Sequence, residues 1–222
     1  MSELDEPNQA RDDRKMREDN DAQGLEKPQV EERERVPPQT VFKALIALIT
    51  GNVILIWLDQ WSKAWAAKAL YTGSAAAAGG VPTNPGELYT RVIEVYSWFN
   101  FRLVGNKGAA WGIFKDLPES VRVKFFVALS VVALFALLWL YFSSHGQRVM
   151  QLGLILISGG AVGNLIDRIQ IGYVVDFIDW HINNHHWPTF NVADIAISVG
   201  VGVLIIDIIM QSFRERTTTA SE

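Results

Sequence analysis

The stretch YVVDFIDWHINNHHWPTFNVAD, which runs from Tyr173 to Asp194, decides how the rest of the chain is interpreted. It carries two carboxylates, Asp176 and Asp194, each set among apolar residues at the edge of a long apolar run. Ionisable side chains next to hydrocarbon cost free energy and usually serve a function. The neighbouring sequence should therefore indicate what function the two aspartates serve.

The chain divides into a polar N-terminal part and a strongly apolar remainder. Its 222 residues are 49% hydrophobic with a formal net charge of -4, yet residues 1–36 hold 12 acidic and seven basic side chains. Low hydrophobicity with high charge cannot offset the entropy of ordering, so residues 1–38 are expected to form a disordered cytoplasmic tail, with a partner-binding arm as the alternative. No cleavable signal peptide is expected, because over 30 polar residues precede the first apolar run.

Composition also excludes several classes of site. The chain has no cysteine, which rules out disulfides, thiolate metal ligands and a cysteine nucleophile. No basic stripe indicates nucleic acid as a partner.

Four apolar runs are long enough to cross the roughly 30 Å of bilayer hydrocarbon. They are Val41–Leu58, Val121–Phe142, Met150–Ile166 and Val192–Met210. Basic residues favour the cytoplasmic side of a membrane. Those near residues 33–35, 148 and 214–216 place both termini and the turn after Ser143 inside, although Arg122 and Lys124 mildly oppose this. We expect a membrane domain over residues 39–212 and a short cytoplasmic tail over residues 213–222.

Two loops then lie on the outer side. In the first, about residues 66–119, the Ala/Gly-rich segment Gly73–Gly86 is expected to be loop. The stretches Arg91–Trp98 and Phe99–Val104 have strand-like composition and predict a small sheet on the membrane surface. Gly108 follows, where a tight turn is favoured. The second, Asp167–Thr189, is interpreted as a polar loop.

Polar side chains from separate segments fall at the outer ends of the spans or in the outer loops, so a single site is expected there. They are Asn106, Asn164, Arg168, Asp176, Asn191 and Asp194, with Asp59 and Lys63 ending the first span on the same side. Asp207 lies about 20 Å along the last helix from Asp194 and is not expected to share the site.

Two carboxylates around one water can hydrolyse a peptide bond. When they share a proton, the ionised one acts as a general base and the protonated one polarises the scissile carbonyl. Because the titration belongs to the pair, neither Asp176 nor Asp194 is assigned a fixed role. Such a dyad needs no metal and no cofactor, and nearby asparagines and an arginine can orient it. The alternatives are structural: Asp176 could cap an interfacial helix, Asp194 could sit in the first turn of the last span, and Arg168 with Asp167 could anchor at the interface.

The histidines within the opening stretch suggest a metal site at first sight. His181 and His185 have the i, i+4 spacing of a zinc-binding helix, but Ile182 stands where the catalytic glutamate of that motif would be. Asn183 and Asn184 favour a turn over a helix. Although Asp179 and His186 could complete a ligand set, an exposed polar loop is the preferred interpretation, and no metal is expected.

Five stretches in order resemble the bacterial lipoprotein signal peptidase family, also called signal peptidase II. They are Asp59-Gln-Trp-Ser-Lys63, Asn106-Lys-Gly-Ala-Ala-Trp111-Gly112, Gly163-Asn164-Leu-Ile-Asp167-Arg168 with Gly159-Gly160 before it, Gly172-Tyr-Val-Val-Asp176-Phe177, and Phe190-Asn191-Val-Ala-Asp194. The resemblance covers residues 41–210, and five ordered motifs make it specific.

The resemblance implies an all-α membrane protein of four transmembrane helices with a small extracytoplasmic β-cradle, in the bacterial inner membrane. It implies an aspartic endopeptidase that removes the signal peptide from prolipoproteins, just before a diacylglyceryl-modified cysteine, and that globomycin inhibits. Asp176 and Asp194 match the catalytic pair. The supporting or substrate-binding positions are Asn106, Gly108, Asn164, Arg168 and Asn191, and more distantly Asp59 and Lys63.

Three features depart from the family pattern. Trp111 stands where the family usually has phenylalanine, and its larger ring is expected to narrow the substrate cleft. The charged tail and the Gly73–Gly86 segment resemble additions to the family core.

Other functions make different predictions. A proton-coupled small transporter would use the carboxylates as a relay, deep in the bundle and within an inverted repeat. No repeat is evident, and both aspartates lie near span ends. A membrane chaperone would tolerate loss of both carboxylates. A presenilin-like peptidase would carry a Gly-x-Gly-Asp motif, which the contexts VVDF and NVAD lack.

Overall fold

The structure is a computed structural model that describes residues 37–72, 90–108 and 118–219. Three of the predictions above fall outside these residues. They concern the charged tail up to residue 36, the Gly73–Gly86 segment and Trp111.

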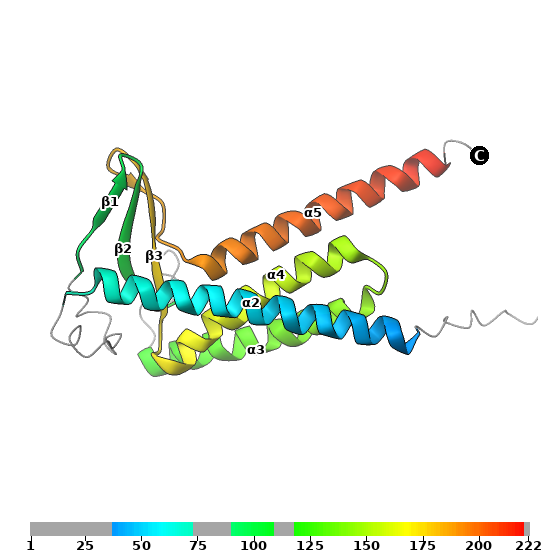
Figure 1. Ribbon diagram of the computed structural model, residues 1–222, viewed down its shortest axis with the longest axis horizontal. Helices are drawn as coiled ribbons and strands as arrows, with labels where there is room; N and C mark the ends of the chain where they lie inside the picture. The colour runs from blue at the N-terminus through cyan, green and yellow to red at the C-terminus, as the bar shows by residue number, and fades with distance from the viewer. Residues whose placement is uncertain (1–36, 73–89, 109–117, 220–222) are drawn as a thin grey trace, which may run out of the picture. The chain divides into compact units, whose positions relative to one another are not determined.

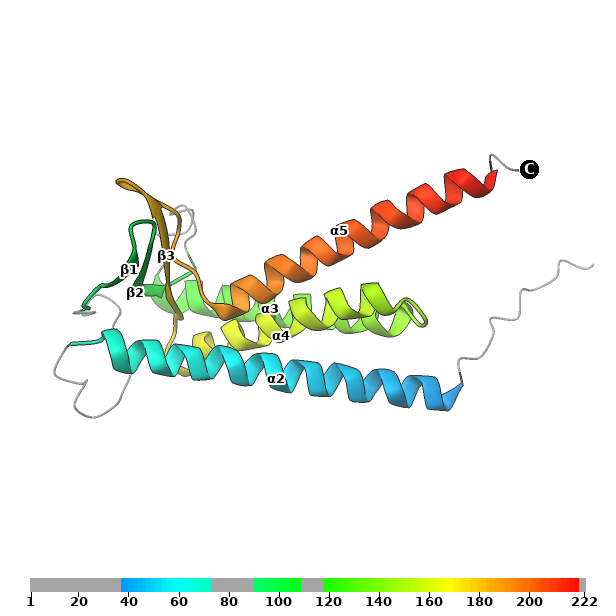
Figure 2. The same ribbon diagram turned by 45° about the horizontal axis from the view of Figure 1, so that its top comes forward.

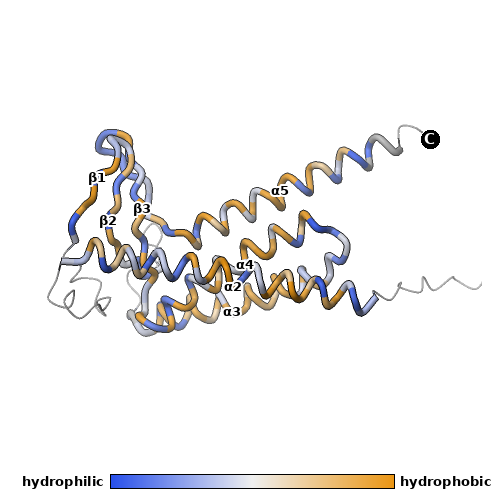
Figure 3. Tube along the Cα trace, viewed as in Figure 1, coloured by the Kyte–Doolittle hydropathy of each residue, from blue (hydrophilic) through white to orange (hydrophobic). Residues whose placement is uncertain are grey.

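The described residues contain four long helices, α2 (Pro38–Leu70), α3 (Glu119–Ser143), α4 (Arg148–Gln170) and α5 (Val192–Thr219) (Figure 1). Each has the length and composition to cross a membrane. Apolar residues recur along all four (Figure 3), and many of their large apolar side chains are exposed, most of all on α2 and α5, as expected of surfaces that face lipid. The protein is therefore a multi-pass membrane protein, and the four predicted spans are confirmed as helices.

Helix α2 continues past Leu58, where the first span was expected to end, to Leu70. The sequence suggested an end because Asp59 and Lys63 are charged. In the structure they form an i, i+4 ion pair of 2.8 Å, with side chains only 1% and 4% exposed. The charges mark a buried contact between helices, so they do not end the helix.

A four-stranded antiparallel sheet has the order β1 (Ile93–Tyr96), β2 (Phe99–Asn106), β3 (Val174–Ile182) and β4 (His185–His186). The two strands expected before residue 106 are confirmed. The interpretation of residues 167–189 as a loop is wrong. Helix α4 continues to Gln170, and strand β3 follows it and pairs along the whole of β2, from Phe99 to Asn106. Valines and aromatic residues favour a strand here, and the two aspartates within β3 obscured that preference.

The sheet packs on the end of α2. Leu70 and Tyr71 at this end share an apolar core with Leu103 of β2 and with Tyr173 and Phe177 around β3. Figures 1 and 2 both show the strands gathered there, near the start of α5. This core fixes β3 beside the ends of the helices.

Helices α4 and α5 approach closely because glycines face each other. A side chain at Gly200 of α5 would meet the carbonyl oxygen of Gly153 of α4 at 2.7 Å. Small residues allow such close packing in lipid, where van der Waals contact drives helix association. The close approach brings the end of α4 near the beginning of α5.

Candidate active site

The two aspartates come from different kinds of element. Asp176 lies within β3, opposite Val104 of β2, and is 1% exposed. Asp194 is in the first turn of α5 and is partly buried. The alternative that Asp176 caps a helix is therefore wrong, whereas Asp194 does lie in the first turn of the last span, the position that its structural alternative gave it.

Asp194 and Asn191 hold each other at the start of α5. The backbone N–H of Asn191 donates to Oδ2 of Asp194 over 3.2 Å, and the backbone N–H of Asp194 donates to Oδ1 of Asn191 over 3.0 Å. This reciprocal pair has the geometry of a capping box, which satisfies two N–H groups at a helix start. The carboxylate of Asp194 is thereby oriented by the helix itself.

The side chain of Asn191 connects α5 to β3. Its Nδ2 donates to Oδ1 of Asp176 over 2.7 Å and to Oδ1 of Asn164 over 3.1 Å, and also lies 3.3 Å from the carbonyl oxygen of Val175. Asn191 is fully buried. A single amide therefore ties together both aspartate-bearing elements and α4.

Asn164 reaches the second carboxylate. Its Nδ2 donates to Oδ1 of Asp194 over 2.8 Å, while its Oδ1 accepts from Lys63 over 3.0 Å as well as from Asn191. The two acceptor contacts fix which end of the amide faces Asp194.

Asn106 completes the contacts of Asp176. Its Nδ2 donates to Oδ2 of Asp176 over 2.9 Å, and its Oδ1 accepts from the backbone N–H of Gly108 over 2.9 Å. Gly108 has a φ of +86°, a conformation that glycine adopts without strain. Each of the four carboxylate oxygens thus accepts one hydrogen bond from a neutral N–H group.

The hydrogen-bond donors around Asp176 and Asp194 are neutral, so they do not force both carboxylates to be ionised, and the pair can hold a proton. Burial raises the pKa of Asp176 from 3.8 to about 7, and the charge of Asp194 acts in the same direction. The hydrogen bonds from Asn106 and Asn191 oppose this rise. Near neutral pH, Asp176 therefore exchanges a proton readily, as a general acid or base must.

Asp59, Lys63 and Asp167 form a buried ion cluster beside the dyad. Lys63 Nζ lies 2.8 Å from Asp59 Oδ2 and 2.9 Å from Asp167 Oδ2, and all three side chains are at most 5% exposed. Asp59 Oδ1 accepts from the backbone N–H of Ala193, and Asp167 Oδ2 accepts from that of Val175, both over 3.0 Å. The cluster therefore holds the residues that directly precede Asp194 and Asp176.

The contribution of Asp167 was missed in the sequence, where Asp167 was considered only as part of an alternative, an interfacial anchor with Arg168. Gln60 donates to its Oδ1 over 2.9 Å. Helix α4 comes close enough because residue 163 is a glycine: a side chain there would meet Oδ2 of Asp59 at 2.5 Å. An acidic residue one helical turn after Asn164, together with Gly163, was the available indication of a helix contact.

Arg168 has a different place from the other supporting residues. Its Nη1 donates to the backbone carbonyl oxygen of Asn164 over 3.3 Å, and its guanidinium lies 5.6 Å from the centroid of the Phe126 ring. The cation–π contact joins α4 to α3. The charges of Asp194, Asp167 and Asp176 act on the guanidinium of Arg168 without a direct hydrogen bond to it.

The histidines lie in the sheet rather than on a zinc-binding helix. His186 Nδ1 contacts the buried Asp179 at 3.0 Å, and Arg102 of β2 pairs with Asp179 at 3.2 Å. Residues 183 and 184 form the expected turn, with φ of 54° at Asn183. The described part of the chain holds no group of three histidine or acidic side chains placed to bind a metal.

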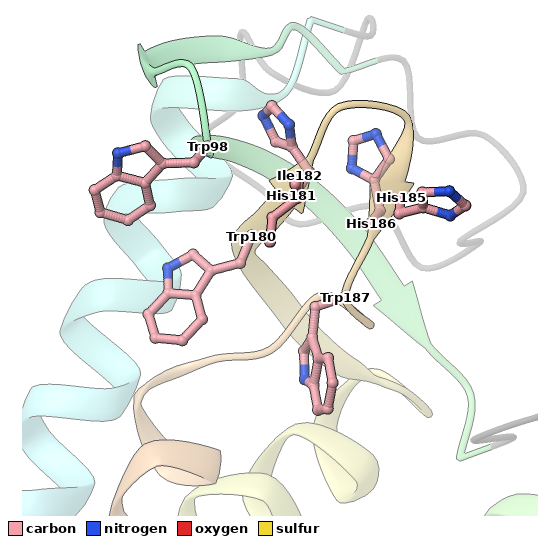
Figure 4. A pocket seen from close by; sticks show the side chains of 7 residues that line it. All are labelled: Trp98, Trp180, His181, Ile182, His185, His186 and Trp187. Carbon is pink, nitrogen blue, oxygen red and sulfur yellow. The ribbon is translucent and has the colours of Figure 1, made fainter.

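A cavity of about 590 Å³ lies on this part of the sheet, separate from the dyad (Figure 4). Indole and imidazole rings make up most of its wall. It is lined by Trp98, Trp180, His181, Ile182, His185, His186 and Trp187. Exposed tryptophans suit the interface between lipid and water.

Comparison with known proteins shows the family of the chain. The family described as Signal peptidase (SPase) II matches residues 52–210. The lipoprotein signal peptidase of Desulforapulum autotrophicum is 37% identical over 75% of this chain and 94% of its own. That of Coxiella burnetii strain RSA 331 is 41% identical over 72% of this chain and 87% of its own.

Solved structures agree as well. One described as a bacterial membrane enzyme, at 2.3 Å resolution, superposes with a TM-score of 0.58 at 30% identity. The match covers 75% of this chain and 89% of that one. By the family match and by its relatives, the chain belongs to the signal peptidase II family.

Proposed function

We propose that this protein removes the signal peptide from prolipoproteins by attack of a water that Asp176 and Asp194 activate together. The observation that carries the proposal is the linkage of these carboxylates through Asn191 and Asn164. Each carboxylate oxygen uses one lone pair on a neutral amide and keeps another for water or substrate. A lysine in the place of these amides would hold both carboxylates ionised and prevent them from sharing a proton.

The chemical steps follow from one proton on the pair. The ionised carboxylate takes a proton from the water, which attacks the scissile carbonyl, while the protonated carboxyl donates to the carbonyl oxygen. The resulting gem-diol collapses as the leaving amine takes up a proton. Because the shared proton belongs to the pair, either aspartate can hold it at the start.

We propose that the substrate is a precursor whose cysteine carries a diacylglyceryl group. A site at one end of the spans lets the signal helix enter from the bilayer while the acyl chains stay in lipid. The relatives' designation as lipoprotein signal peptidases supports this class. We also propose a globomycin-type cyclic peptide as an inhibitor that occupies the dyad.

The membrane orientation is part of the proposal. Both termini and the turn between α3 and α4 would face the cytoplasm, with the sheet and the dyad at the outer face. The basic residues near the chain ends support it by the positive-inside rule. The alternative of a proton-coupled transporter is not supported, because the family match is to a peptidase and the aspartates lie near the ends of spans.

The test compares two peptides that span a lipoprotein signal sequence and differ only in the diacylglyceryl group on cysteine. The purified protein in detergent micelles should cut the lipidated peptide directly before that cysteine, and globomycin should block the cut. Equal cutting of the unmodified peptide would contradict the substrate assignment. Failure to cut either peptide, by protein that still binds globomycin, would contradict the proposed activity itself.

A further inference from the structure

A second cavity, of about 580 Å³, lies between α2 and α4 at the other end of the bundle from the dyad. Its wall includes Lys43 near the start of α2 and Arg148 at the start of α4. Arg148 precedes Asn164 by about 24 Å of helix, and Lys43 precedes Lys63 by about 30 Å. The cavity is therefore no part of the catalytic site.

Three polar side chains of this cavity are available to bind a ligand. Within the residues that the structure describes, Lys43, Arg148 and Gln151 make no side-chain hydrogen bond and no ion pair. The described residues that line the cavity include no acidic side chain. Two exposed cations that lack a counter-ion favour an anionic occupant.

The rest of the wall is apolar and runs along the spans. Ala47 of α2 and Leu152 and Ile155 of α4 line it. The small side chains of Ala44 and Ala47 leave room there, and Ala44 is fixed by the hydroxyl of Tyr141, which donates to its carbonyl oxygen over 2.7 Å. The two cations at the helix ends could bind the phosphate of a lipid headgroup, and the apolar wall next to them could bind its acyl chain.

We propose that this cavity binds one anionic phospholipid, with the phosphate between Lys43 and Arg148 and an acyl chain along Ala47 and Ile155. Basic pockets between transmembrane helices are known to hold acidic headgroups. The membrane itself supplies this ligand, because the cavity lies at an end of spans that face lipid. Under the proposed orientation it opens to the cytoplasmic leaflet.

The test is native mass spectrometry of the full chain in neutral detergent, titrated with phosphatidylglycerol or phosphatidylcholine of the same acyl chains. We expect one phosphatidylglycerol to bind in preference to phosphatidylcholine. Lys43→Gln and Arg148→Gln should each weaken its binding about fivefold, and the double variant about 25-fold. Lys124→Gln, which removes an exposed charge near the start of α3, is the matched control and should bind as the unmodified chain does.

A variant that fills the cavity distinguishes binding within the cavity from non-specific attraction of an anionic lipid to the two cations. Ala47→Phe keeps both charges but fills the cavity, so phosphatidylglycerol binding should fall at least tenfold. Unchanged binding by Ala47→Phe or by the double glutamine variant would overturn the proposal, as would equal binding of the two lipids.

Discussion

Asn191 donates a hydrogen bond from its side-chain amide to Oδ1 of Asp176 over 2.7 Å, although the two residues lie on different elements. The same residue directly precedes α5 and caps its first turn, which carries Asp194. The distance between the proposed catalytic carboxylates therefore depends on one buried asparagine.

Replacement of Asn191 by alanine should lower kcat about 100-fold, because a misplacement of about 1 Å at a reacting group has an effect of that size. The substitution also removes the N-cap of α5, which costs about 1 kcal/mol of stability. Single-turnover cleavage of a lipidated peptide measures the first effect, and the melting temperature measures the second. Asn184→Ala, at an exposed turn, is the control, and a kcat loss as large in it would contradict the specific role of Asn191.

Lys63→Met should destabilise the fold more than it alters the chemistry. Asp59 and Asp167 both lie within 2.9 Å of Lys63 Nζ, so methionine leaves two buried carboxylates without their cation. Breaking a buried ion pair by removing one partner costs about 3–5 kcal/mol. Thermal unfolding in detergent should show a large loss for Lys63→Met and little change for the exposed Lys124→Met. Similar melting temperatures for the two variants would contradict the structural role of the cluster.

The activity should depend on pH through the proton of the dyad. Because the pKa of Asp176 is raised to about 7, kcat/KM should fall as pH rises through about 7 and the pair loses its proton. Between the pKa of Asp176 in the unfolded chain, about 3.9, and its pKa in the folded protein, about 7, unfolding releases a proton from this residue. The contribution of Asp176 to the free energy of unfolding therefore decreases as pH rises through that window.

Asn106→Ala provides the check on this assignment. It removes a donor that favours the ionised form of Asp176, so the pKa should rise and the alkaline limb of the profile should move up by about one unit. A limb that stays in place, or moves to lower pH, would show that a different group controls it.

The proposed orientation can be tested because the natural chain has no cysteine. In spheroplasts, a membrane-impermeant maleimide should label Asn184→Cys in the β3–β4 turn directly. It should label Gln147→Cys, between α3 and α4, only after the membrane is permeabilised. The unmodified chain gives the background, and the reverse pattern would refute the orientation.

The sequence predicted the parts of the fold that depend on local chemistry. Four apolar runs predicted four helices, and strand-like composition predicted β1 and β2. Strand β3 was missed because its assignment depends on pairing with β2, some 70 residues away in the chain, and because Asp176 and Asp179 suggested a loop. The end of α2 was misplaced because the charges of Asp59 and Lys63 neutralise each other only after the chain folds.

The motifs in the sequence named the residues of the candidate site, but they did not predict which of these residues are hydrogen-bonded to each other. Nothing in the sequence indicates that Asn191 bonds to Asp176, or that Asp167 holds the backbone of Val175. Such contacts join elements whose relative placement is set by packing, including the close approach of Gly163 to Asp59.

The central claim is that Asp176 and Asp194 activate the attacking water together. The most direct measurement is the single-turnover rate of lipidated peptide cleavage by Asp176→Asn and by Asp194→Asn. Asparagine matches the shape of aspartate and keeps one acceptor oxygen, so both variants should keep the fold and lose at most one hydrogen bond each, about 1 kcal/mol of stability. Each should lose at least about 10⁴-fold in rate, because the two groups act as a unit. Turnover by either variant at the rate of the unmodified enzyme would contradict the claim.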